Sequence, residues 1–156
     1  MGEDSQNMTK KGDFHRSSMH RLTKYNFKVI FLQVINMPFE VVYTDEFGDW
    51  WDTLSEHEQD DVAATVELLA DKSPTLPFPY SSGIEGSKHS HMRELRIQHA
   101  GKPYRVLYAF DPRRAVILLF GGDKTGNDRW YKEFVPIADA LYDQHVEELK
   151  KEGKIK

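Results

Sequence analysis

The chain has 156 residues, a formal net charge of −4 and no cysteine. This length suits one domain with a substantial hydrophobic core, and it is too short for two domains of ordinary size. The lack of cysteine excludes disulfides, thiolate metal sites and a cysteine nucleophile, and it suits the reducing cytoplasm, where we expect the protein to be found. Hydrophobic residues make up 39% of the chain, which indicates a globular rather than a disordered protein.

The charges are unevenly distributed along the chain. Residues 40–71 contain eleven acidic residues and no lysine or arginine, whereas residues 88–105 contain five basic residues and one acidic residue. A net negative charge argues against a nucleic-acid partner, but a local basic patch is what binds phosphate groups. The alternative is that the two stretches are ordinary solvated surfaces of opposite sign.

Residues 1–36 are expected to form an N-terminal extension, partly disordered, ahead of a domain over residues 37–156. The first twenty residues are polar and have no periodic pattern. The apolar run from Phe27 to Ile35 is too short to span a bilayer, and no signal-peptide cleavage site follows it. The extension either adds an extra strand or is upstream sequence translated ahead of a start at Met37, and we expect no membrane association.

The domain begins with a predicted strand over residues 39–43, followed by a helix that Thr44 or Asp45 can cap. Four apolar side chains then follow at i, i+3, i+4 and i+7, the spacing of one helix face: Phe47, Trp50, Trp51 and Leu54. Ser55 and Glu58 form an S-x-x-E capping box, so a second helix is predicted to begin there. A proline-rich stretch ends this helix because proline cannot continue it.

Three strands are predicted next, over residues 92–98, 104–110 and 115–120. The last of them, AVILLF, is apolar on both faces and should therefore be the central strand. The glycines after Phe120 break the strand pattern. A final helix is predicted from Pro136 to about Lys151, since proline fits the first turn of a helix.

This order of elements predicts an α+β fold. We expect an antiparallel four-stranded sheet with an N-terminal helical hairpin on one face, and a C-terminal helix. The hairpin covers one face and leaves the other face free. Arg96 and Arg105 are expected on that free face, because an unpaired guanidinium is costly to bury.

Several residues could support cleavage of a phosphodiester without a metal, which needs a base, an acid and cations that stabilise the phosphate. Arg96, Arg105 and Lys124 are suitable cations on neighbouring strands or at a strand end. Trp130 and Tyr131 could stack a base. The candidate proton carriers are three histidines: His89, His91 and His99.

Other interpretations of these residues stay open. Arg96 and Arg105 could instead be surface residues paired with Glu94 or with the acidic helices. His89 and His91 could hold a metal only with a third ligand, and none has suitable spacing, so no metal site is predicted. The GGDKTG sequence lacks the spacing of a phosphate-binding P-loop.

Four segments between Phe39 and Leu149 carry a resemblance: TDEFGDWWDTLSE, GSKHSHMRELRI, YRVLYAFDPRRAVILLFGGDKTGNDRWY and PIADALYDQHVEEL. They resemble the toxins of type II toxin–antitoxin systems, in the RelE/ParE superfamily, and most closely its HigB-like, phage-derived branch. The resemblance implies a microbial RNase (RelE-like) fold and a metal-independent, ribosome-dependent mRNA endonuclease that needs no cofactor. It also implies a cognate antitoxin, a small helix-turn-helix protein, besides the ribosome and mRNA as partners.

The resemblance implies a catalytic role for four residues, on the family's basic and aromatic motif positions: Arg96, Arg105, Lys124 and Tyr131. The surrounding residues expected to bind RNA are Arg93, Lys102, Trp130 and His99. The chain departs from the RelE pattern by a long helix after the catalytic aromatic. The superfamily also contains gyrase poisons, so a gyrase-poisoning toxin, or an inactive member that still binds antitoxin, remains an alternative. We expect the antitoxin to contact residues 45–71 and to leave the catalytic cations open.

Overall fold

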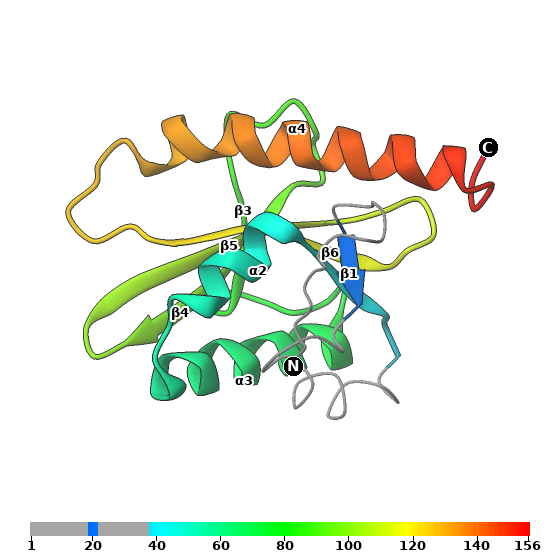
Figure 1. The fold of residues 1–156 in the computed structure, drawn as a ribbon. Coiled ribbons are helices and arrows are strands. Elements are labelled where there is room, and N and C mark those ends of the chain that lie inside the picture. The colour runs from blue at the N-terminus through cyan, green and yellow to red at the C-terminus, as the bar shows by residue number, and fades with distance from the viewer. Residues whose placement is uncertain (1–18, 22–37) are drawn as a thin grey trace, which may run out of the picture.

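The structure, a computed structural model, describes residues 19–21 and 38–156. Its elements, in chain order, are the strands β1 (Met19–Arg21) and β2 (Val41–Thr44), the helices α2 (Asp45–Asp52) and α3 (Glu56–Lys72), the strands β3 (Ser81–Gly83), β4 (Arg93–His99), β5 (Lys102–Phe110) and β6 (Val116–Asp123), and the helix α4 (Trp130–Lys151). They form a central sheet with helices on both of its faces (Figure 1). The predicted α+β class is confirmed.

The sheet differs from the predicted four antiparallel strands. The described residues form six strands in the order β1-β2-β6-β5-β4-β3, and β2 runs parallel to β6. Two helices and three strands separate β2 from β6 in the chain, so local sequence pattern does not set their relative direction. β3 has the sequence SSG, which lacks the apolar alternation that identifies a strand. The prediction that the AVILLF strand is buried is confirmed, because β6 lies between β2 and β5.

Both predicted helix starts are confirmed. The Thr44 side chain accepts a hydrogen bond from Phe47 N at 3.0 Å, which caps α2. Ser55 and Glu58 form the predicted capping box, with hydrogen bonds of 3.2 and 2.7 Å. These contacts satisfy backbone N–H groups that the first turn of a helix leaves without partners.

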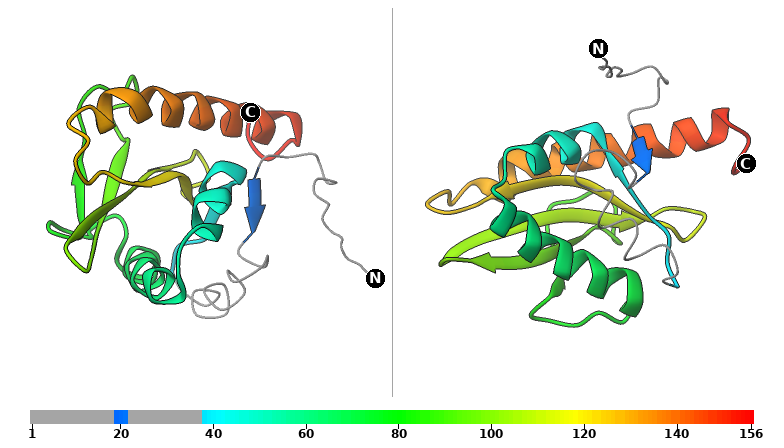
Figure 2. Two further views of the ribbon diagram at one scale, coloured as in Figure 1. Left: turned by 60° about the vertical axis from the view of Figure 1, so that its left-hand side comes forward. Right: turned by 60° about the horizontal axis from the view of Figure 1, so that its bottom comes forward.

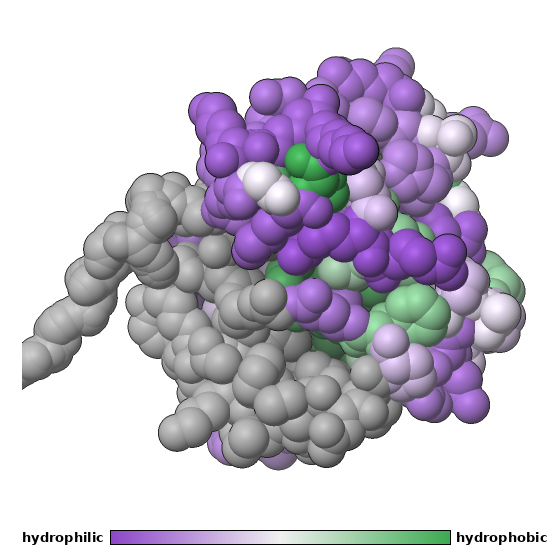
Figure 3. All heavy atoms as spheres, turned by 90° about the vertical axis from the view of Figure 1, so that its right-hand side faces the viewer, coloured by the Kyte–Doolittle hydropathy of each residue, from purple (hydrophilic) through white to green (hydrophobic). Residues whose placement is uncertain are grey.

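Helices cover both faces of the sheet, which corrects the prediction of one free face. One hydrophobic cluster joins α2 and α3 to one face, and a second cluster joins α4 to the other face. The further views place α4 and the α2–α3 pair on opposite sides of the sheet (Figure 2). On the side of the molecule where α4 ends, the described surface is mainly hydrophilic and has only small hydrophobic patches (Figure 3).

Helix α4 begins at Trp130 rather than at Pro136, which lies inside the helix. The start was missed because proline is normally a sign of the first turn. A stripe of side chains with helical spacing extends back past the proline and packs on the sheet: Trp130, Phe134, Val135, Ala138, Leu141 and Tyr142. Burial of this stripe outweighs the cost of a proline inside a helix, which is about 3 kcal/mol.

Two glycines extend β6 beyond its predicted end and allow aromatic rings to pack on it from both sides. A Cβ atom at Gly121 would lie 2.2 Å from the Trp50 ring, and one at Gly122 would lie 2.9 Å from Trp130 Nε1. No side chain fits at either position. The glycines that break the strand pattern in the sequence therefore continue the strand in the fold.

The extension contributes one described element. β1 lies within residues 1–36 and pairs antiparallel with β2, Met19 opposite Thr44. The boundary at residue 36 stays a prediction, and the apolar run from Phe27 to Ile35 lies outside the described residues. Among the described helices, none is long and apolar enough to cross a bilayer.

Candidate functional site

Three of the residues predicted from the sequence contact one carboxylate, that of Glu94, and a fourth contacts one of these three. The register places Arg96 opposite Arg105, and strand alternation puts Glu94 on the same face as both. Tyr131, in the first turn of α4, and Lys124, just after β6, complete the group. We call Glu94, Arg96, Arg105, Lys124 and Tyr131 the Glu94 cluster.

Both carboxylate oxygens of Glu94 are occupied, and the residue is only 3% exposed. Its Oε2 atom accepts hydrogen bonds from Ser82 Oγ at 2.7 Å and from Arg96 Nη1 at 3.1 Å. Its Oε1 atom accepts a hydrogen bond from the Tyr131 hydroxyl at 2.7 Å. A buried carboxylate with charge-assisted hydrogen bonds of this kind is held in a fixed orientation.

Arg105 is buried, 4% exposed, which corrects the expectation of an arginine on an exposed face. Its Nη1 donates to Tyr104 O at 3.0 Å. Its Nε lies 3.5 Å from Glu94 Oε1, an ion pair without a hydrogen bond, and so this N–H has no hydrogen-bond acceptor among the described residues. A buried guanidinium with an unused donor is suited to bind an additional anionic oxygen.

Arg96, Lys124 and Tyr131 are each partly exposed. The Lys124 ammonium lies 5.6 Å from the centre of the Tyr131 ring, which is a cation–π contact. Burial, followed by the hydrogen bond to Glu94, raises the pKa of the Tyr131 hydroxyl. This hydroxyl therefore keeps its proton at neutral pH and can act as a proton donor.

The residues expected to bind RNA lie outside the Glu94 cluster. Trp130 is 2% exposed and packs against Gly122 and Phe120, so its ring has no free face for a base. Arg93 projects from the opposite sheet face, as register and alternation require, and donates from Nε to Ser81 Oγ at 3.1 Å. The two other residues expected to bind RNA, His99 and Lys102, lie near the acidic helix α3.

His99 ends β4, and its Nδ1 lies 2.5 Å from Asp61 Oδ2 on α3. Its ring stacks on Tyr104, whose hydroxyl donates to Glu58 on the same helix. Lys102 is exposed at the turn between β4 and β5. Hydrogen bonds from Tyr104 and Ser55 lower the pKa of Glu58, and the charge of Lys102 lowers it further. His99 and Lys102 therefore lie beside the acidic helix α3.

The remaining candidate proton carriers, His89 and His91, attach the loop before β4 to α4. His89 Nε2 lies 2.8 Å from Asp143 Oδ1, and His91 Nε2 lies 3.1 Å from the Tyr142 hydroxyl. Burial and the neighbouring His89 lower the pKa of His91. Tyr142 lies eleven residues after Tyr131, about 16 Å further along the helix. The two histidines thus contact a different part of α4 from the Glu94 cluster.

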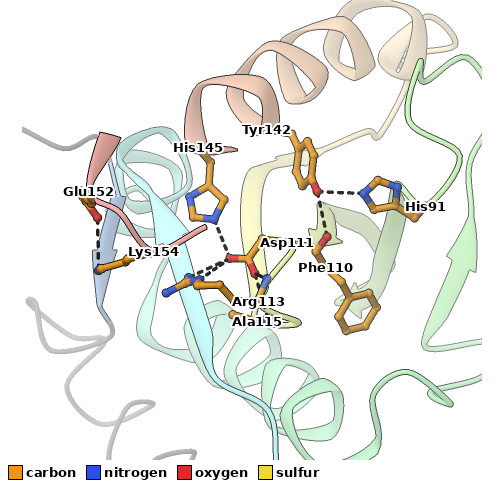
Figure 4. Close-up of polar contacts among 9 residues, drawn as sticks. All are labelled: His91, Phe110, Asp111, Arg113, Ala115, Tyr142, His145, Glu152 and Lys154. Carbon is orange, nitrogen blue, oxygen red and sulfur yellow. Dashed lines mark hydrogen bonds and ion pairs between the residues drawn. The ribbon is translucent and has the colours of Figure 1, made fainter. Parts of the chain in front are cut away.

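A second buried carboxylate, Asp111, lies beneath the later part of α4 (Figure 4). Its Oδ2 atom is 2.8 Å from both His145 Nε2 and Arg113 Nη2. Its Oδ1 atom accepts hydrogen bonds from the backbone N–H groups of Arg113 and Ala115. Burial alone would raise the pKa of Asp111, but hydrogen bonds from His145 and Arg113 lower it to about 2. We call Asp111, Arg113 and His145 the Asp111 cluster.

Glu94 is the site residue that the sequence reasoning did not select. Two signals were available: it alternates with Arg96 along β4, and it is an acid within a basic stretch. Pairing of the arginines with Glu94 was considered only as a sign of an ordinary surface. Among the described residues, no group of three histidine or acidic side chains could hold a metal ion.

Comparison with known proteins identifies the family. The model of the phage-derived Gp49-like family matches residues 49–143. A Mycobacterium tuberculosis protein named as toxin HigB3 is 40% identical over 100 residues, which are 64% of this chain and 86% of that protein. A second protein from the same organism, named as toxin HigB2, is 34% identical over 104 residues, and the chain spans about half (52%) of its length. No solved structure matches. The chain therefore belongs to the phage-derived Gp49-like family and is a HigB-like toxin.

Proposed function

We propose that this toxin inhibits translation as an endoribonuclease that cuts mRNA on the ribosome. The observation that carries the proposal is the Glu94 cluster, where two arginines and a phenol contact one fixed carboxylate and a lysine lies against the ring of that phenol. The cations exceed the single carboxylate in charge, so the cluster favours a second anion such as a phosphodiester. The toxin would act in the cytoplasm, where ribosome-bound mRNA is found.

Each member of the cluster has a role in the proposed reaction. Glu94 accepts the proton of a ribose 2′-hydroxyl, whose oxygen then attacks the adjacent phosphorus. The bond from phosphorus to the 5′ oxygen breaks, and Tyr131 protonates that oxygen. The products are a 2′,3′-cyclic phosphate and a 5′-hydroxyl. Because the Tyr131 hydroxyl lies 2.7 Å from Glu94, the carboxyl can return the proton directly to the tyrosinate.

The cations would bind the phosphate in two steps. Arg96 and Lys124 are partly exposed, and a phosphate arriving from solvent reaches them first. Arg105 lies deeper and provides the unused Nε–H donor for the charge that develops on the phosphate oxygens. The donor set gives no preference for a divalent metal, because its one carboxylate is already paired with two arginines.

A cognate antitoxin is the partner that we propose for the toxin. The expectation that the antitoxin contacts residues 45–71 is supported by the acidic surface of α2 and α3, where Glu56, Asp60 and Asp71 are exposed. These helices lie on the sheet face opposite the Glu94 cluster. An antitoxin bound there would leave the catalytic cations open, and it would keep the toxin off the ribosome by its bulk.

The proposal is tested in a purified translation mixture that contains ribosomes, a defined mRNA and the full chain. We expect new 5′-hydroxyl ends within the reading frame, only when ribosomes are bound. Glu94→Gln keeps the shape of the side chain but removes the base, and should slow cutting by about 100- to 10,000-fold. Glu85→Gln, at an exposed glutamate before β4, is the matched control and should cut normally.

Two results would contradict the proposal. One is intact mRNA together with DNA cleavage complexes of gyrase, which would make the toxin a gyrase poison. The other is normal cutting by folded Glu94→Gln, which would place the reaction elsewhere in the molecule.

A further inference from the structure

A turn over residues 77–81, next to the Glu94 cluster, holds an aromatic ring outward. Pro77 O accepts hydrogen bonds from Tyr80 N at 2.9 Å and from Ser81 N at 3.1 Å. Arg96 N donates to Tyr80 O at 2.9 Å, which fastens the turn to β4. Phe78 thus lies in a hydrogen-bonded turn, so the position of its backbone is fixed before any ligand binds.

The exposure of this turn is unusual for its residue types. Only three large hydrophobic side chains are exposed in the described part of the chain, and two of them lie here: Phe78, 68% exposed, and Tyr80, 45% exposed. Leu76, 5% exposed, anchors the same segment in the core beneath α3. Phe78 is therefore not needed to fix the segment. Single exposed hydrophobic residues are common, but two aromatic rings on one short turn suggest a binding role.

Arg96 connects the ring to the cluster. Its guanidinium carbon lies 4.9 Å from the centre of the Phe78 ring, and its Nη1 donates to Glu94 Oε2 at 3.1 Å. One guanidinium group thus separates the exposed ring from the carboxylate. Since Arg96 covers one part of the ring while most of Phe78 stays exposed, the ring retains open surface.

We propose that Phe78 is a stacking platform for a nucleobase of single-stranded RNA, adjacent to the phosphate held by Arg96. The inference rests on the proposed function and adds to it a binding site for the base. Unpaired bases stack on aromatic side chains and on guanidinium planes, and every base has a suitable π-face. The platform therefore contributes affinity and position without reading the sequence.

The charges near the turn favour RNA over a protein ligand. The platform adjoins the cationic cluster of Arg96, Arg105 and Lys124, which matches a phosphate backbone. Stacking of the base next to the reacting phosphate also restricts the position of the ribose. The 2′-hydroxyl is then held near Glu94, which is the proximity that cleavage requires.

The test measures binding of short RNA probes to the full chain. The probes carry 2′-fluoro riboses, so that they are not cut, and a series of them lacks the base at one position each. Phe78→Leu keeps a hydrophobic side chain but removes the ring, whereas Phe78→Tyr keeps the ring. Ile137→Ala, which removes the third exposed hydrophobic side chain, is the control on α4. Thermal unfolding of each variant verifies its fold.

We expect Phe78→Leu to weaken binding of the complete probe by about 5- to 150-fold, and Phe78→Tyr and Ile137→Ala to leave it nearly unchanged. With the base missing at one particular position, the Phe78→Leu variant and the unaltered chain should bind the probe equally well. Cutting of ribosome-bound mRNA, measured separately, tests the proposed function. If mRNA is not cut, but the effect of Phe78→Leu on binding disappears with one abasic probe, the proposed function fails and the platform remains.

Three results would overturn the platform. The first is that Phe78→Leu weakens binding by the same factor with every abasic probe. The second is the absence of binding by the unaltered chain at millimolar probe. The third is a Phe78→Leu variant that binds RNA normally but loses affinity for the antitoxin, which would assign the ring to a protein contact.

Discussion

The Glu94 and Asp111 clusters both lie beneath α4, and each has a buried carboxylate bonded to a side chain of that helix. Tyr131 reaches Glu94, and His145 reaches Asp111 about 21 Å further along the helix. They differ in charge balance. Asp111 accepts from one arginine and one histidine, and both of its oxygens are fully used. The Glu94 carboxylate pairs with two arginines, and the ammonium of Lys124 lies against the ring of Tyr131 beside it.

Burial of a carboxylate does not by itself indicate its function. Structural and catalytic ion pairs can both be buried, so a buried acid is weak evidence for either role. The excess of positive charge is the informative feature, together with the unused donor of Arg105 and the partly exposed cations beside it. We therefore propose that the Glu94 cluster binds the ligand, and that the Asp111 cluster attaches α4 to the turn between β5 and β6.

Among the changes that test the comparison of the two clusters, Arg105→Ala has the largest expected effect. Removal of the guanidinium should reduce mRNA cutting by about 100- to 1,000-fold, since a preorganised donor to the phosphate is lost. It should also lower the free energy of unfolding by about 3 kcal/mol, because Glu94 loses its buried ion-pair partner. Urea unfolding and single-turnover cutting measure the two effects. Loss of stability with normal cutting would make Arg105 purely structural.

Asp111→Asn is the matched substitution in the other cluster. The amide keeps the size of the side chain but loses the charge that Arg113 and His145 require. We expect the free energy of unfolding to fall by about 3 kcal/mol, with normal cutting per folded molecule. If the folded variant fails to cut mRNA, the division between the two clusters is wrong.

The Asp111 cluster should also determine part of the stability in acid. The folded pKa of Asp111, about 2, lies below its unfolded value, so its contribution is fully present above the unfolded pKa. It is lost as the pH falls from about 5 through the folded pKa, and amounts to about 2 kcal/mol. Unfolding measured at a series of pH values should show this decrease, and Asp111→Asn should make it shallower. If Asp111→Asn and the unaltered chain lose stability equally as the pH falls, the assignment is contradicted.

Lys124→Ala should have the smallest effect. Its ammonium is partly exposed and contacts the Tyr131 ring, so we expect about a fivefold loss of cutting, corresponding to about 1 kcal/mol. Stability should hardly change. Lys102→Ala, at an exposed turn outside the cluster, is the control and should cut normally. Equal effects of the two substitutions would indicate a general influence of charge rather than a site.

Much of the local structure was predictable from the sequence. The capping box of Ser55 and Glu58 and the cap by Thr44 depend on residues three apart, and both helix starts were found. The start of α4 was missed because Pro136 suggested a first turn, while the stripe that begins at Trp130 is stabilised by the sheet. The continuation of β6 through Gly121 was also missed, because it depends on tertiary packing: Trp50 of α2 fills the space above the glycine.

The family, the α+β class and the basic and aromatic residues of the candidate site could be identified before the fold was known, because they follow from residue types and their local spacing. Which of those residues contact one another depends on the packing of the fold. Pairing of β4 with β5 placed Arg96 opposite Arg105, and packing of α4 brought Tyr131 to Glu94. The same packing buried Trp130 and Arg105. The contact between Tyr131 and Glu94 joins residues 37 positions apart, whereas Arg96 and Arg105 belong to one hairpin. In both cases register and burial depend on how the whole sheet and its helices pack together.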